Sequence, residues 1–162
     1  MRHRNRGRKL GVTPTHRRAM GKNLIQGLVD NERIITTVPK AKQFKPLAER
    51  IIHLSKVKNL TNIRRVASLL GSRELQVQWY DDAKDAKKSK IHTTLQKLFE
   101  DIGPRNKARV GGYTRIVRLA KRRVGDASER CILELVESDL TETISKGKAK
   151  AAEAESGTAG AK

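Results

Sequence analysis

The chain has 162 residues, with 36 Lys and Arg against 17 Asp and Glu, so its formal net charge is +19. That length suits one domain with extensions, and the charge predicts a polyanionic partner, because a soluble surface needs a net charge of only about 2–8. The single cysteine excludes an intramolecular disulfide and predicts a reducing compartment. The sequence has no apolar run of about 18 residues, so a membrane span is not expected.

The positive charge is concentrated at the start of the chain. Residues 1–29 hold eight Lys and Arg and no acid. Residues 1–13 have few apolar side chains, so we expect an extended basic arm that becomes ordered on a polyanion. Guanidinium groups of such an arm can each donate two hydrogen bonds to a phosphate. The alternative is a solvated, disordered tail.

The segment after the arm predicts a helix and then a strand. Thr13-Pro14 is typical of an N-cap followed by proline in the first helical turn. Apolar residues then recur at helical spacing, among them Leu24 and Leu28, and the helix should end near residues 30–31. The β-branched run at residues 33–38 predicts a strand, which the following proline should end.

Three more helical segments are expected. Residues 41–52 have helical apolar spacing, and Pro46 predicts that the regular helix begins or kinks there. Residues 61–70 predict a helix that is capped by its first threonine and closed by the glycine after it. Residues 91–99 carry another apolar stripe, which Gly103-Pro104 should end. The stretch 74–90 has no clear assignment.

A second basic run lies between Pro104 and Gly125, with eight Lys and Arg and no acid. Residues 113–119 and 130–136 predict two strands, and alternation places Cys131, Leu133 and Leu135 on one face. With the strand at 33–38 they predict a small sheet of about three strands. The expected fold class is α+β, with helices packed on that sheet.

We therefore expect three regions in the chain. These are an extended basic N-terminal arm (residues 1–13), an α+β RNA-binding core (14–137) and a flexible low-complexity C-terminal tail (138–162). The tail is rich in Ala, Gly, Ser, Lys and Glu and has no sustained apolar stripe.

Catalytic and cofactor motifs are not found. The sequence lacks a Walker or Rossmann glycine loop and the histidine or cysteine spacing of a metal site. Gly111-Gly112 predicts a turn, or else a close approach of backbone to phosphate. Cys131 has no activating base beside it and predicts a buried small hydrophobe. We therefore expect no enzyme, cofactor, metal or small-molecule substrate.

Several ordered blocks of the sequence resemble the L-seventeen family of bacterial large-subunit ribosomal proteins. They are MRHRNRGRKLGVTPTHRRAMGKNL at the start, ERIITTVPKAK (32–42), KLFEDIGPR (97–105), GGYTRIVRL (111–119) and CILELV (131–136). The stretch from about residue 73 to 90 and the tail after Val136 are longer than the family's usual pattern.

The resemblance implies a structural constituent of the ribosome in the cytoplasm. It implies binding to 23S rRNA in the large (50S) subunit near the polypeptide exit tunnel, in support of assembly and translation. It also implies contact with other large-subunit proteins, including the one numbered thirty-two. The matched segments and the remaining basic clusters give these candidate RNA contacts: Arg2, His3, Arg4, Arg6, Arg8, Lys9, His16, Arg17, Arg18, Lys22, Lys40, Lys42, Arg64, Arg65, Arg105, Arg109, Arg115, Arg118, Lys121 and Arg122.

Two other classes of protein share some of these features. A DNA-binding nucleoid or regulatory protein would have similar charge, but a convincing helix-turn-helix or dimerising heptad seam is not visible. An RNA-processing enzyme would need catalytic groups that the sequence does not show. The few aromatic residues favour phosphate binding over base stacking.

Overall fold

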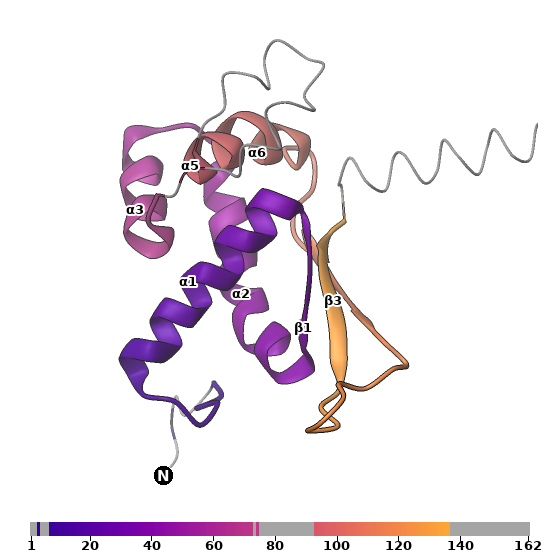
Figure 1. The fold of residues 1–162 in the computed structure, drawn as a ribbon. Coiled ribbons are helices and arrows are strands. Elements are labelled where there is room, and N and C mark those ends of the chain that lie inside the picture. Colours follow the sequence, from indigo (N-terminus) through magenta and orange to yellow (C-terminus); the bar gives the residue numbers. More distant parts are fainter. Residues whose placement is uncertain (1–2, 4–6, 73, 75–92, 137–162) are drawn as a thin grey trace, which may run out of the picture.

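A computed structural model describes residues 3, 7–72, 74 and 93–136. In chain order its elements are α1 (Pro14–Asn31), β1 (Arg33–Thr37), α2 (Val38–Ser55), α3 (Leu60–Leu70), α5 (Thr94–Lys97), the π-helical segment η2 (Leu98–Ile102), α6 (Gly103–Arg105), β2 (Thr114–Arg118) and β3 (Arg130–Leu135). The helices lie on one side of a small sheet (Figure 1). The α+β prediction is therefore confirmed.

The sheet has three antiparallel strands in the order β1-β3-β2. Leu133 of the central strand lies opposite Ile34 on one side and Ile116 on the other. The predicted inward face of β3 is confirmed, since Cys131, Leu133 and Leu135 are all buried. Both outer strands are short, so pairing to one central strand fixes their register.

The core fills the space between this sheet and helices α1 and α2. Ile25 and Leu28 of α1 and Ile51 and Ile52 of α2 are almost completely buried and belong to the same apolar cluster as Leu133. Complete burial of one such side chain stabilises the fold by about 1.5–3 kcal/mol. Tight packing also limits side-chain size, because a Cβ on Gly21 would lie 2.6 Å from the Phe44 ring.

Helix α1 begins and ends as the sequence predicts. The Thr13 side chain accepts a hydrogen bond from the His16 amide, and proline occupies the first turn. The helix ends at Asn31, and Glu32 then adopts a left-handed backbone with φ 58°. A non-glycine residue in this conformation is uncommon, so surrounding contacts must hold Glu32 in place.

Helix α2 begins earlier than expected. It starts at Val38, directly after β1, and continues through Pro46. Of the two alternatives for Pro46, a helix start there is wrong, and a kink there stays a prediction. The strand ends at Thr37, one residue before the predicted end, and Pro39 lies in the first turn of α2. Proline suits a first helical turn, because its amide nitrogen needs no partner there. The missing hydrogen bond at Pro46 is offset by burial of Phe44 and Ala48 on either side.

The remaining helices differ from prediction at their ends. Helix α3 is capped by Asn59, whose side chain accepts from the Thr61 amide, so the predicted cap at Thr61 was wrong. The helical path from Thr94 does not stop before Gly103-Pro104 but continues to Arg105. The absence of a Cβ on Gly103 lets this path pack against the Ser55 carbonyl, and Pro104 again occupies a first turn.

Two predictions fall largely outside the described residues. The predicted tail and most of the unassigned stretch 74–90 lie there, although Glu74 forms a single antiparallel bridge with Thr93. Residues 91–92, the start of the predicted stripe, also lie outside. Within the described part of the chain, none of the helices is long and apolar enough to cross a membrane.

Candidate nucleic-acid interface

Three segments that are distant in sequence meet at one end of the molecule. They are the arm with the start of α1, the start of α2, and the connection between β2 and β3, which gather at the lower end of Figure 1. We call this the basal surface and define it by its predicted contact residues: Arg8, Lys9, His16, Arg17, Arg18, Lys40, Lys42, Arg118, Lys121 and Arg122. Lys22 lies one helical turn beyond Arg18.

Local hydrogen bonds fix the arm to this surface. The Arg8 amide donates to the Gln43 side-chain oxygen at 2.6 Å, and the Arg17 guanidinium donates to the Lys9 carbonyl at 3.4 Å. The first turns of α1 and α2 contain no acid, so these turns supply no carboxylate to the nearby lysines and arginines. Arg2, Arg4 and Arg6 lie outside the described residues.

The remaining predicted contacts do not join the basal surface. Arg64 and Arg65 are exposed on α3, away from this end (Figure 1). Arg109 is half-buried, and its carbonyl accepts hydrogen bonds from Lys56 and Tyr113. Arg115 lies at the far end of β2 and donates to Glu134. Sequence proximity grouped Arg105 to Arg122 into one run, but the fold distributes that run over both ends of the molecule.

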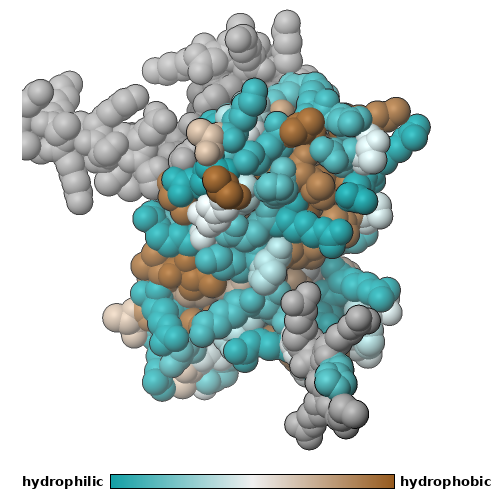
Figure 2. All heavy atoms as spheres, turned by 180° about the vertical axis from the view of Figure 1, so that it is seen from behind, coloured by the Kyte–Doolittle hydropathy of each residue, from teal (hydrophilic) through white to brown (hydrophobic). Residues whose placement is uncertain are grey.

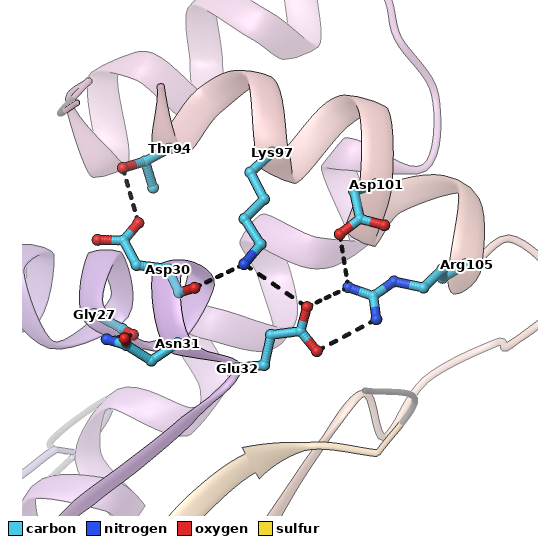
Figure 3. Close-up of polar contacts among 8 residues, drawn as sticks. All are labelled: Gly27, Asp30, Asn31, Glu32, Thr94, Lys97, Asp101 and Arg105. Atoms are coloured by element: carbon cyan, nitrogen blue, oxygen red, sulfur yellow. Dashed lines mark hydrogen bonds and ion pairs between the residues drawn. The ribbon is translucent and has the colours of Figure 1, made fainter. Parts of the chain in front are cut away.

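Arg105 belongs to an internal charged cluster that sequence analysis missed (Figure 3). Its guanidinium donates two hydrogen bonds to the Glu32 carboxylate and one to Asp101. The buried Lys97 ammonium donates to the Asp30 carbonyl at 2.7 Å and lies 3.8 Å from Glu32. We name Asp30, Glu32, Lys97, Asp101 and Arg105 the charged clip, since they join the end of α1 to α5 and α6.

The clip changes the titration of its lysine. Burial lowers the pKa of Lys97, and attraction to Glu32 opposes that effect.

The only sequence signals for the clip were acids at the end of a helix and a lysine on an otherwise apolar stripe. Those signals do not say which charges meet, because Asp30 and Lys97 are 67 residues apart.

A second ionic group lies on the outer face of the sheet. Arg33, Glu134 and Arg115 are directly opposite one another across the three strands, and both arginines donate to the Glu134 carboxylate. Burial alone would raise the pKa of Glu134, but these hydrogen bonds outweigh burial and the pKa is lowered. Part of the Arg115 guanidinium is therefore used to pair β2 with β3 through Glu134.

The ionic group of Arg33, Glu134 and Arg115 predicts that the stability of the protein falls in acid. Because the pKa of Glu134 in the folded protein lies below its ordinary value of 4.5, its stabilising effect is present above that pH and is lost as pH falls through the folded value. We expect Glu134→Gln to lower the urea midpoint at pH 7, and the two proteins to converge as the pH falls through the lowered pKa of Glu134 in the folded protein. Glu129→Gln, at an exposed position, is the control. Parallel curves for wild type and Glu134→Gln would contradict the assignment.

The described residues hold no obvious reaction centre. They contain no group of three or more His, Cys, Asp or Glu side chains that could hold a metal ion. Burial raises the pKa of the Cys131 thiol, which disfavours the reactive thiolate. His53 pairs with the Tyr113 hydroxyl at 3.0 Å, so it fixes a loop. In the view of Figure 2, hydrophilic side chains cover most of the surface between separate apolar patches.

Geometry and charge thus define a small basic α+β protein whose predicted contact residues gather mainly at one end of the described structure. A family model described as Ribosomal protein L17 matches residues 20–136. Relatives named "Large ribosomal subunit protein bL17" include one from Magnetococcus marinus, 41% identical over 87% of this chain and 97% of that protein. Another, from Streptococcus mutans, is 45% identical over 80% of this chain and 98% of that protein.

The chain therefore belongs to the ribosomal protein L17 family, of the bacterial large subunit. Family membership confirms the resemblance seen in the sequence and the prediction of a non-enzymatic protein. It excludes the two alternative classes, a DNA-binding protein and an RNA-processing enzyme. The predicted cytoplasmic location within the ribosome follows from the same membership.

Proposed function

We propose that this protein binds 23S rRNA and acts as a scaffold in the large subunit, near the polypeptide exit tunnel, in support of assembly and translation. The basal surface supports this proposal most directly. It brings together cations from three separate segments, and the shared position is a property of the fold rather than of any one basic run. Such a surface is suited to joining RNA segments.

Binding is expected to act through phosphates. Each cation that neutralises a phosphate releases a counterion, so affinity falls as salt rises. Side chains cannot read the deep, narrow major groove of an RNA helix, and the described residues of the basal surface include no Phe, Tyr or Trp on which bases could stack. Specificity therefore comes from the shape of the folded RNA that fits all three segments at once.

The proposal assigns a role to each region of the chain. The arm, residues 1–13, extends along RNA and contributes Arg8 and Lys9 to the basal surface, and the core from 14 to 137 contributes the other residues of that surface. The predicted tail, 138–162, lies outside the described residues. Arg64 and Arg65 form a second RNA contact on α3. Arg105 is left out of the interface, because two carboxylates hold its guanidinium. Large-subunit proteins, including the one numbered thirty-two, are the protein neighbours.

Deletion of residues 2–9 tests the role of the arm. We expect the shortened protein to enter 50S particles poorly while its circular dichroism spectrum stays nearly unchanged, since the deleted segment contributes no core residue. Sedimentation of tagged protein through a sucrose gradient measures incorporation. Its affinity for 23S rRNA should also depend less steeply on salt, by about 0.7–0.9 in slope for each lost phosphate contact.

The full-length protein provides the reference for the whole proposal. If its affinity for 23S rRNA were the same at low and high salt, phosphate binding by the basal surface would be refuted. If the deletion variant were incorporated normally, the arm would be a solvated tail and the core alone would direct assembly.

A further inference from the structure

An open trough runs between the arm and the body of the protein. Two adjoining pockets form it, with volumes of about 670 and 380 Å³, and both are lined by Arg8 and Lys42. The first pocket extends along α2 to Pro46, and the second extends to Arg118 and Ser128 at the ends of the β2–β3 connection. We call this the arm trough. Its walls are therefore the arm, α2 and the β2–β3 connection.

The outer wall depends on one glutamine. The Arg8 amide donates to the Gln43 side-chain oxygen at 2.6 Å, and this bond joins residues 35 apart. Gly7 lies beside the same amide group: a Cβ there would be 3.5 Å from Gln43 Nε2, and its φ of +102° favours glycine. Gln43 thus holds Gly7 and Arg8 in the position that closes the trough along one side.

The lining of the trough suits the backbone of a nucleic acid strand. Arg8, Lys42 and Arg118 provide three cations from three segments, while Glu129 is the one acid among the described lining residues. Arg118 and Glu129 are 4.0 Å apart, with side chains 65% and 55% exposed. A pair this exposed contributes little, so Arg118 can exchange Glu129 for a phosphate.

Three apolar residues are among those that line the trough. Val38, Pro39 and Pro46 line it, and none of its described lining residues is aromatic. This arrangement matches a strand that places phosphates against cations and sugars against aliphatic carbon, without bases stacked on rings. An acidic peptide would satisfy the cations too, but it has no repeating sugar to place against these aliphatic carbons.

We propose that the arm trough holds one RNA strand through consecutive phosphates, and that Gln43 is the positioning residue that seats the arm over it. This inference rests on the proposed rRNA binding and assigns it a particular site. Gln43 itself carries no charge and acts through Arg8. Nothing in the sequence distinguishes Gln43 from the other polar residues of its helix.

The test compares Gln43→Ala with wild type in full-length protein, using filter binding to transcribed 23S rRNA over a series of salt concentrations. Loss of the arm position should lower affinity about three- to tenfold and reduce the salt slope by about 0.7–0.9, the value for one phosphate. Gly7→Ala should do the same. In an Arg8→Ala background, Gln43→Ala should have little further effect, because both changes remove one contact.

Control variants separate this site from general charge. Lys42→Ala in the trough and Lys107→Ala, an exposed lysine after α6, lose the same charge. We expect only the former to change the salt slope. Equal effects of these two, or wild-type binding by Gln43→Ala, would overturn the trough while leaving rRNA binding intact. Competition by poly-glutamate as strong as by RNA would point to an acidic peptide instead and would also overturn it.

Discussion

Glu32→Gln is expected to lower the free energy of unfolding by about 3–5 kcal/mol, the cost of removing one partner from a buried ion pair. The Lys97 side chain is 0% exposed and that of Glu32 is 7% exposed. Glutamine keeps the shape of glutamate but cannot balance Lys97 and Arg105. The buried Lys97 ammonium would then lose its largest attraction, that of Glu32, and would keep the weaker attractions of Asp101 and Asp30 beside the repulsion of Arg105.

Urea unfolding at pH 7 measures this effect. The matched control is the exposed ion pair Lys58–Glu100, whose side chains are 59% and 42% exposed at 3.1 Å. Glu100→Gln should cost less than about 1 kcal/mol, because water already solvates both groups. The double variant Glu32→Gln, Lys97→Met should recover part of the loss. A similar small loss for both single variants would show that the charged clip is not energetically coupled.

Gly103→Ala is expected to destabilise the protein by about 2–3 kcal/mol through overpacking. Its Cβ would lie 2.9 Å from the Ser55 carbonyl carbon and 3.1 Å from the Leu98 carbonyl oxygen. These are backbone atoms, so rotation of a side chain cannot relieve the contact. Helix α2 and the helical path from α5 to α6 would have to separate, and this would loosen the packing of Ile52 and Ile102.

Gly27→Ala is the control for replacing a glycine that lies inside a helix but has space for a Cβ atom. Gly27 lies inside α1, and the nearest atom to an added Cβ is the Ile34 methyl group at 3.9 Å. Alanine has a higher helix propensity, so this variant should gain about 0.5–1 kcal/mol. Thermal unfolding of the two variants should therefore shift in opposite directions. A stable Gly103→Ala protein would show that the close approach to Ser55 is not required.

Local chemistry explains why parts of the fold were predictable. The cap at Thr13, the β-branched strand at 33–37 and the alternation on β3 depend on residues within a few positions of one another. The ends of α2 and of the segment around Gly103 depended on packing partners far away in sequence. Pro46 stays within its helix only because its neighbours are buried.

The sequence by itself determined the α+β class, the basic character and the family, because composition, periodicity and ordered motifs are properties of the linear chain. The tertiary structure alone decided which charges act together. Coulomb interactions depend on distance in space, and folding moved Arg105 inward to Glu32 while it brought Arg8, Lys42 and Arg118 to one trough. Neighbours in the same basic run therefore form ion pairs at one end of the molecule and line the proposed RNA-binding trough at the other.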